Sequence, residues 1–229
     1  NFTSEIIAYY IAPLINSAGR LRDASIASEF LFTTDLNRAK EILEELKNFN
    51  NERKNLESLI TKEALKQVKS SDKIAIVSGN DWNEGVVGIV ASRVSEYFKM
   101  PSIALSCKEG ICKGSGRSYG DCDLFKLVGT AKEYFLKFGG HKSAIGLSFK
   151  KEYLLVIKSL LNLQVEQVCG EIKNIDKAIL GILPFCEIDL DLIKLIEQFE
   201  PFGEANLKPK FIAKDVEILD IKTMGQNSE

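Results

Sequence analysis

The sequence predicts an α/β fold in which helices cover a mixed β-sheet, with a long helix before the sheet and a further strand after it. Three observations carry this prediction. Residues 36–68 lack Gly and Pro, and their apolar residues recur at three- and four-residue steps, as in a helix. From residue 71, short β-rich runs alternate with helical patterns, which is typical of helices packed on a sheet. An alternating run at 211–221 follows a turn at 200–203 and indicates the start of another domain.

The elements begin with a compact lead-in at residues 1–35. Pro13 and a turn at 16–20 interrupt an otherwise helical pattern, and Thr34 or Asp35 then caps the long helix. That helix, with the range 36–70, measures roughly 50 Å at 1.5 Å per residue. It is either a rigid connector between two domains or an ordinary packed helix, and the residues favour neither interpretation.

Residues 71–190 are expected to form one domain and residues 191–229 to form a linker and the first strand of the next. The expected strands are 73–78, 102–106, 110–116 and 144–149, with a strand-rich stretch at 178–190. The expected helices are 84–98, 123–136, 152–168 and 191–199.

The charge is balanced overall but uneven along the chain. The formal net charge of the 229 residues is -2, which is not the signature of a strongly basic nucleic-acid-binding domain. Between residues 108 and 151, however, nine Lys and Arg side chains face four Asp and Glu. This local excess suits a groove for a polyanion, although a solvated face would have the same composition.

Composition also limits the cellular setting. No apolar run is long enough to cross a bilayer, so we expect a soluble protein without membrane partners. The five cysteines are odd in number and contain no C-x-x-C pair, which favours reduced thiols in a cytoplasmic protein. The first residues resemble no signal peptide, and we expect a piece of a longer protein.

Two glycine-rich segments are the strongest candidates for a binding site. They are interpreted as loops at 114–118 and 138–144, and the second holds the single histidine. Glycine lets backbone N–H groups approach an anion closely, an arginine can hold a phosphate with two hydrogen bonds, and Ser and His side chains add donors. The predicted phosphate-binding residues are Gly116, Arg117, Ser118, Gly139, Gly140 and His141. The alternatives are a plain turn at 114–118 and a helix C-terminus at 138–139.

Other motifs have ordinary structural explanations. Gly85 and Gly88 lie at the start of a helix and are expected to permit close packing of this helix on the sheet, and Trp82 is expected to be a core or hinge residue. The pairs Asp121/Asp123 and Asp189/Asp191 lie at helix starts, where carboxylates serve as caps. One histidine and these capping pairs predict no metal site in this chain.

Five motifs in order resemble the C-terminal part of the RecJ family of single-strand-specific DNA exonucleases, in the DHH phosphoesterase superfamily. The resemblance spans nearly the whole chain. The glycine-histidine motif alone would indicate only a DHH-associated domain, which small oligonucleotide phosphatases and alanyl-tRNA synthetases also contain. The motifs at both ends make the resemblance more specific. They lie at 13–20, 50–54, 82–93, 114–118 with 139–146, and 201–206.

The resemblance implies a division of labour. Residues 1–35 would be the end of a DHH catalytic domain, 71–190 the DHH-associated domain, and 191–229 the start of an OB-fold. In the family, the DHH domain binds two divalent ions, manganese or magnesium, for phosphodiester hydrolysis. Arg117, Ser118 and His141 would hold phosphates of single-stranded DNA, and Asn16 and Arg20 would line the adjoining cleft.

The implied function is therefore part of a 5′-to-3′ exonuclease in recombination and repair, inactive as this fragment, with single-stranded DNA and other repair proteins as partners. The alternatives are a DHH oligoribonuclease or cyclic-dinucleotide phosphodiesterase and a non-catalytic nucleic-acid-binding module. Leu14 and Asn83 depart from the family pattern, which has Arg and His there, so no role is assigned to them.

Overall fold

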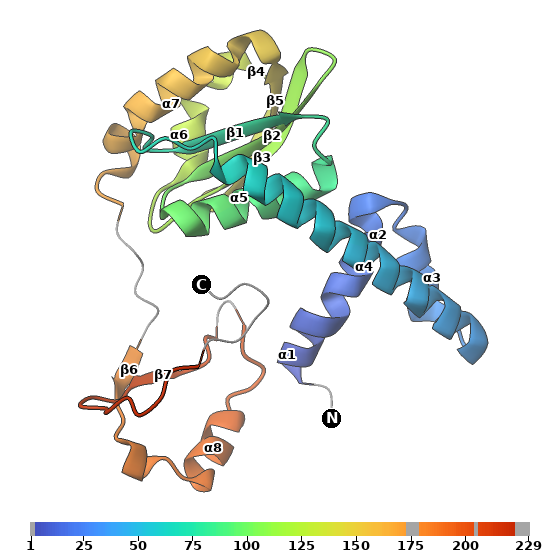
Figure 1. Cartoon of the computed structure of the whole chain (residues 1–229), viewed down its shortest axis with the longest axis vertical. Helices are drawn as coiled ribbons and strands as arrows, with labels where there is room; N and C mark the ends of the chain where they lie inside the picture. Colours follow the sequence, from blue (N-terminus) through green and yellow to red (C-terminus); the bar gives the residue numbers. More distant parts are fainter. Residues whose placement is uncertain (1–2, 173–178, 204–205, 223–229) are drawn as a thin grey trace. The chain divides into compact units, whose positions relative to one another are not determined.

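The computed structural model describes residues 3–172, 179–203 and 206–222, and the chain divides into two compact units (Figure 1). The larger unit spans residues 8–175, and the smaller one combines residues 1–7 with 176–229. The larger unit contains a π-helical turn that begins at Ile7, six α-helices, two 3-10 turns and a five-stranded sheet. Its helices are α2 (Ala12–Leu21), α3 (Ser25–Phe32), α4 (Leu36–Leu65), α5 (Glu84–Phe98), α6 (Leu124–Gly129) and α7 (Leu154–Cys169). Its strands are β1 (Ala75–Asn80), β2 (Ser102–Lys108), β3 (Ile111–Arg117), β4 (Phe135–His141) and β5 (Ala144–Lys150).

The predicted turn at 16–20 is wrong, because these residues form the second half of α2. Pro13 lies in the first turn of this helix, where its missing N–H breaks no helical hydrogen bond. Ser17 and Ala18 are buried, and the Ser17 hydroxyl donates to the carbonyl oxygen of Leu14. Packing against α4 thus keeps the segment helical despite Gly19.

The predicted long helix is confirmed as α4, which Asp35 caps by accepting the backbone N–H groups of Asn37 and Arg38. Its first half contributes Ile42 and Leu46 to a small core with α2 and α3. Its second half contributes Ile60 and Ala64 to the core that α5 forms with β1 and β2. One helix therefore joins two separate cores, as a connector does.

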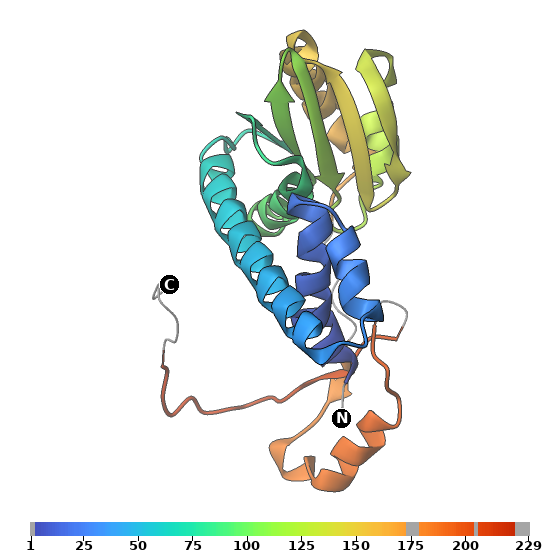
Figure 2. The same ribbon diagram turned by 90° about the vertical axis from the view of Figure 1, so that its right-hand side faces the viewer.

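The sheet is mixed, as predicted. Its strand order is β1-β2-β3-β5-β4, with β1 and β2 parallel and the other neighbours antiparallel. Helices α6 and α7 cover one face, where Leu124, Leu161 and Phe149 belong to the main core. Helices α4 and α5 cover the other face over β1 and β2, where Val77 and Ala104 are buried. In Figure 2, β3, β5 and β4 lie in front of α6 and α7, and on the second face of these strands α5 packs against β3.

The helix predicted over 123–136 is wrong in its second half. Helix α6 ends at Gly129, a 3-10 turn spans Lys132–Tyr134, and β4 begins at Phe135. Phe135 and Phe138 pack against the main core, which favours a strand at the sheet edge over a longer helix. The two glycine segments are consequently not loops, since 114–117 lie in β3 and 139–141 in β4.

Several smaller predictions are confirmed. Trp82 is buried, and its indole N–H donates to Glu63. Asp123 and Asp189 cap α6 and α8 (Leu190–Glu197) by accepting backbone N–H groups. Asn83, to which no role was assigned, caps α5 in the same way by accepting the N–H of Gly85.

The cysteine prediction is wrong for four of the five residues. Cys107 is bonded to Cys112, Cys122 is bonded to Cys169, and Cys186 is free and exposed. Cys107 and Cys112 are cross-strand partners in β2 and β3, and Cys169 ends the helix that packs against α6. Only the folded arrangement brings these pairs together.

The smaller unit contains β6 (Ile179–Ile182), which pairs in parallel with β7 (Lys210–Ile212), together with α1 (Ser4–Ile6), α8 and a 3-10 turn. The strands predicted at 178–190 and 211–221 are therefore mostly wrong, since each described strand is short. Residue 178 and residues 204–205 of the 201–206 motif lie outside the described residues.

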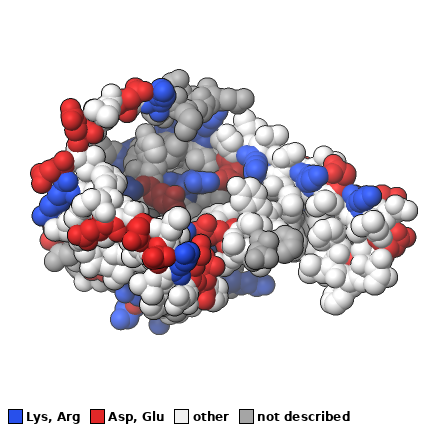
Figure 3. Space-filling model, turned by 90° about the horizontal axis from the view of Figure 1, so that it is seen from below, with Lys and Arg blue, Asp and Glu red and all other residues white. Residues whose placement is uncertain are grey.

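The described surface reflects the composition. Basic and acidic side chains are interspersed on the face that Figure 3 shows, in keeping with the small net charge. Among the described residues, none of the helices is both long and apolar enough to cross a membrane.

Candidate functional site

The open half of the sheet brings three of the predicted phosphate-binding residues, Arg117, Gly139 and His141, onto one surface. Side chains alternate between the two faces of a strand, and directly paired residues share a face. Arg117 pairs with Ala144, which pairs with His141, and Gly146 pairs with Gly139. We call this surface the open sheet face. It comprises Lys113, Ser115 and Arg117 of β3, Ala144, Gly146 and Ser148 of β5, and Lys137, Gly139 and His141 of β4.

Arg117 lies where the open sheet face meets α5. Its Nη1 donates to the carbonyl oxygen of Gly116 at 2.8 Å, and a Cβ built on Gly88 of α5 would lie 3.1 Å from its Nη2. Burial lowers the pKa of the Arg117 guanidinium, and the positive charge of Arg20 lowers it further. Within the described part of the chain, no carboxylate forms an ion pair with it. Arg117 is therefore a half-buried cation whose charge is not paired with a carboxylate among the described residues.

Arg20 approaches the same place from α2. Its Nη1 donates to the carbonyl oxygen of Gly85 at 2.9 Å, and a Cβ on Gly85 would meet the Arg20 backbone at 2.0 Å. Gly88 permits close packing of α5 on β3, as expected, whereas Gly85 permits close packing of α2 on α5, a contact between helices and not the expected one with the sheet. Asn16 is exposed one helical turn before Arg20, on the same side of α2. The structure brings Arg20 to Arg117, with Asn16 alongside.

The remaining predicted residues divide between the open sheet face and its support. The Nδ1 of His141 accepts the backbone N–H of Ser143 at 3.3 Å, which leaves Nε2 of a neutral imidazole to donate outward. The hydroxyl of Ser118 donates to the Cys122 carbonyl oxygen and its N–H donates to Ser143, so Ser118 holds the strand end in place.

The glycines also have distinct positions. Gly116 faces the core, where a Cβ would lie 2.8 Å from Ile145. Gly140 has a φ of 144° in the approach to the β4–β5 turn, and a Cβ there would lie 2.3 Å from the Ala144 carbonyl oxygen. Gly139 and Gly146 have nothing within 4 Å of a built Cβ. The first two therefore shape the sheet, while the other two leave its surface bare.

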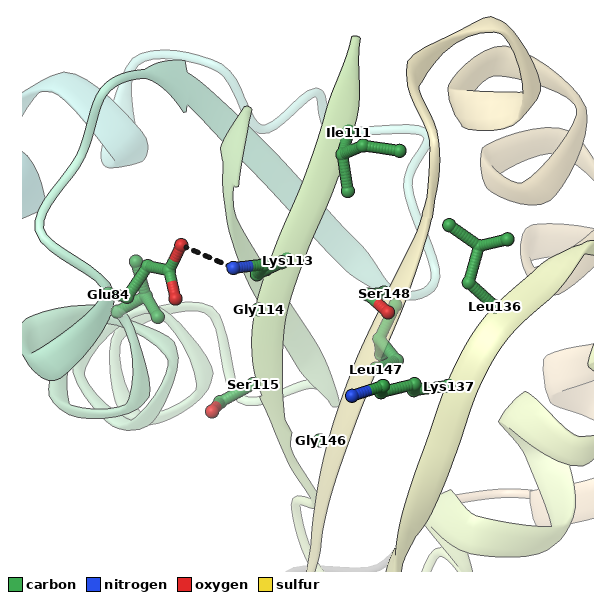
Figure 4. A pocket seen from close by; sticks show the side chains of 11 residues that line it. Glu84, Ile111, Lys113, Gly114, Ser115, Leu136, Lys137, Gly146, Leu147 and Ser148 are labelled. Carbon is green, nitrogen blue, oxygen red and sulfur yellow. Dashed lines mark ion pairs between the residues drawn. The ribbon is translucent and has the colours of Figure 1, made fainter. Parts of the chain in front are cut away.

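A groove of about 610 Å³ lies on the open sheet face beside α5 (Figure 4). Lys113 forms an ion pair of 3.2 Å with Glu84 at its rim, and Lys137 extends from β4 over β5. The groove is lined by Glu84, Val87, Ile111, Lys113, Gly114, Ser115, Leu136, Lys137, Gly146, Leu147 and Ser148.

Sequence reasoning missed Lys113, Ser115, Lys137 and Ser148. The signal that was overlooked is the alternation of side chains along a strand, in which every second residue faces the same side. Once 135–141 is recognised as a strand, Lys137 and His141 fall on one side of it, as Lys113 and Arg117 do in β3.

The described residues do not fit a metal centre. Over residues 3–172, 179–203 and 206–222, no group of three or more His, Cys, Asp or Glu side chains could hold an ion. We therefore assign no metal-dependent step to these residues.

Two domain families match this sequence. Residues 71–175 match the DHHA1 domain, and residues 181–229 match the RecJ OB domain.

Curated relatives match nearly the whole chain. The single-stranded-DNA-specific exonuclease RecJ of Bacillus subtilis (strain 168) is 32% identical over 97% of the chain, which covers 29% of that protein. The protein of the same name from Haemophilus influenzae is 31% identical over 99% of the chain, which covers 41% of that protein. The chain thus spans less than half the length of these relatives.

Solved structures of RecJ also match most of this chain. RecJ of Thermus thermophilus in complex with Mg²⁺ is 28% identical and superimposes with a TM-score of 0.82 over 91% of this chain and 33% of that one. Its complex with Mn²⁺ gives a TM-score of 0.83 over 92% of this chain and 32% of that one.

Proposed function

We propose that this chain is part of a RecJ-type enzyme, namely the substrate-holding part of a 5′-to-3′ single-stranded DNA exonuclease of recombination and mismatch repair. The observation that carries the proposal is the open sheet face. It places Arg117, His141, Lys113 and Lys137 over a surface of Gly, Ala and Ser backbone. Such a surface can approach a flexible polyanion closely and hold it through phosphate contacts, without reading the sequence.

We assign the phosphate contacts to residues on or beside this surface. Arg117 and Arg20 would share one phosphate, whose charge would relieve their mutual repulsion. His141 would donate through Nε2, and the exposed backbone at Gly139 and Gly140 would let the strand lie close. Asn16 would extend the contact along α2. Gly116 and Ser118 would act indirectly by fixing the end of β3.

The chemical step would need a divalent ion, magnesium or manganese, as the Thermus complexes suggest. The described residues lack a fitting group of ligands, so we propose that a DHH domain outside this chain binds the ions. The chain alone would bind DNA and leave it intact.

The proposed organisation follows from this role. Residues 1–35 would complete the catalytic domain and 36–70 would act as the connector. Residues from 71 onward would form the DHH-associated domain, and an OB-fold would begin between residues 175 and 191. Other repair proteins would be partners, and the location would be cytoplasmic. The two disulfides are unusual for that compartment.

The proposal is tested by Arg117→Ala. We expect the affinity of the chain for a fluorescein-labelled single-stranded oligonucleotide to fall about tenfold at low salt, as loss of a charge-assisted contact to phosphate predicts. Fluorescence anisotropy measures the affinity. The matched control is Lys126→Ala, because Lys126 is exposed on α6, on the covered side of the sheet. Equal affinities of the wild type and Arg117→Ala would overturn the proposal.

The match of residues 181–229 to the RecJ OB domain favours the exonuclease over the alternative phosphodiesterases. A competition experiment distinguishes the exonuclease from the phosphodiesterases. A single-stranded oligonucleotide should displace the labelled DNA, whereas a cyclic dinucleotide at the same phosphate concentration should not.

A further inference from the structure

We propose that the groove on the open sheet face is a subsite for one nucleobase of the bound strand. The inference rests on the proposed function, since it assumes that phosphates lie at Arg117. It adds a contact of a different kind. The base would leave the backbone beside Arg117 and lie against the sheet between α5 and the edge strand β4.

The first argument is shape. Gly146 lies on β5, the middle strand of the groove, paired with Ser115 on one side and Gly139 on the other. With no side chain at Gly146, a flat ring can rest directly on the peptide planes of β5. The volume of about 610 Å³ also far exceeds what a single phosphate group fills.

The second argument is the chemistry of the walls. Val87 of α5, Ile111 of β3 and Leu136 of β4 border the groove. Contact with the faces and edges of a base removes the apolar surface of these walls from water, which is favourable in free energy. Contact with a solvated phosphate brings no such gain. The hydroxyls of Ser115 and Ser148 both donate and accept, so they can meet the polar edge of any base.

The third argument is the charge at the rim. Glu84 forms an ion pair with Lys113, and this carboxylate disfavours a phosphate on the α5 side of the groove. Lys137 lies on the opposite side, where a flanking phosphate would be favoured (Figure 4). The strand backbone would therefore follow Arg117 and Lys137, with the base directed toward Glu84.

The fourth argument is spacing. Ser115 precedes Arg117 by two residues of β3, which corresponds to about 7 Å along a strand. This distance resembles the step between neighbouring phosphates of an extended strand. A nucleotide held at Arg117 can thus place its base, or that of its neighbour, over Gly146.

The test is Gly146→Val in the complete chain. A built Cβ at Gly146 meets nothing within 4 Å, so the added side chain would project from β5 into the groove, where a flat ring would otherwise rest, without a clash at its Cβ. The probes are a labelled oligothymidylate of about 12 nucleotides and an abasic strand of the same length, which lacks bases but keeps the phosphates. We expect the wild type to bind the intact strand about fivefold more tightly than the abasic strand. Gly146→Val should abolish this preference and leave the affinity for the abasic strand unchanged.

The control is Ser159→Val, which adds the same side chain at an exposed position of α7, on the covered side of the sheet. It should bind both strands as the wild type does. A Gly146→Val variant that retains the preference would overturn the nucleobase subsite, as would equal wild-type affinities for the two strands. If Gly146→Val lowers the affinity for both strands equally, the groove holds a phosphate and not a base. Failure of the proposed function is separate, because it would appear as an Arg117→Ala variant that binds both strands normally.

Discussion

Arg117 shows how a single residue can be positioned at the expense of stability. Its guanidinium is half-buried, faces the like charge of Arg20, and hydrogen-bonds the carbonyl of its own neighbour. Burial and Arg20 both lower its pKa, which means that the folded state disfavours the charged form. Because a guanidinium stays protonated in proteins, this unfavourable energy persists in the folded chain.

Replacing the charge should therefore stabilise the free chain. Arg117→Met keeps a long side chain across Gly88 but removes the cation. We expect its Tm, measured by calorimetry, to rise by about 1–2 °C. The control is Lys126→Met, which removes an exposed lysine, and the Tm of this variant should equal that of the wild type. A lower Tm for Arg117→Met would show that the guanidinium is a structural group.

At the scale of elements, α4 and α5 are joined by a carboxylate between two arginines. Glu57 of α4 accepts hydrogen bonds from Arg53 in the same helix and from Arg93 of α5. The side chains of Glu57 and Arg53 are each only 12% exposed. Removing either one would therefore leave the charge of the other largely buried and uncompensated. This junction holds the connector against the helix that positions Arg117.

Glu57→Ala tests the junction. It would leave Arg53 partly buried with Asn50 as a hydrogen-bond partner but without a carboxylate. We expect the free energy of unfolding, measured in urea, to fall by about 2 kcal/mol. The control on the same helix is Glu44→Ala, which removes an exposed pair with Lys47 and should change it by less than about 0.5 kcal/mol. Similar losses in both variants would contradict the role of the junction.

The elements that the sequence predicted well are those with a local signal. Helix α5 has the predicted bounds of 84–98, and the strand ending at Arg117 is displaced by one residue from the prediction. Strand β4 was missed because its residues contain two adjacent glycines and lie at a sheet edge. Its stability comes from pairing with β5, which a window of local residues does not contain.

At the scale of the whole molecule, an acidic chain is proposed to bind DNA. The net charge is -2, but the sheet register concentrates Lys113, Arg117 and Lys137 on one surface. Local potential governs association when charges lie within about 10 Å of the ligand at moderate salt.

The affinity for single-stranded DNA should consequently fall with salt. A plot of log K against log salt concentration should have a negative slope, and Arg117→Ala should reduce its magnitude by about 0.7, as loss of one phosphate contact predicts. Anisotropy titrations at several salt concentrations measure the slope. Lys126→Ala should keep the wild-type value. A wild-type affinity independent of salt would contradict a phosphate-held strand.

The sequence alone determined the fold class and the long helix, and its motifs indicated the resemblance to RecJ and the candidate residues Arg20, Arg117 and His141. Each of these has a local pattern or a motif. Only the tertiary structure decided that the glycine segments are strands, that Gly116 faces the core while Gly139 faces outward, and that Lys113 and Lys137 join the same surface. The physical reason is that strand pairing sets which face a side chain occupies. That pairing depends on residues far apart in the chain.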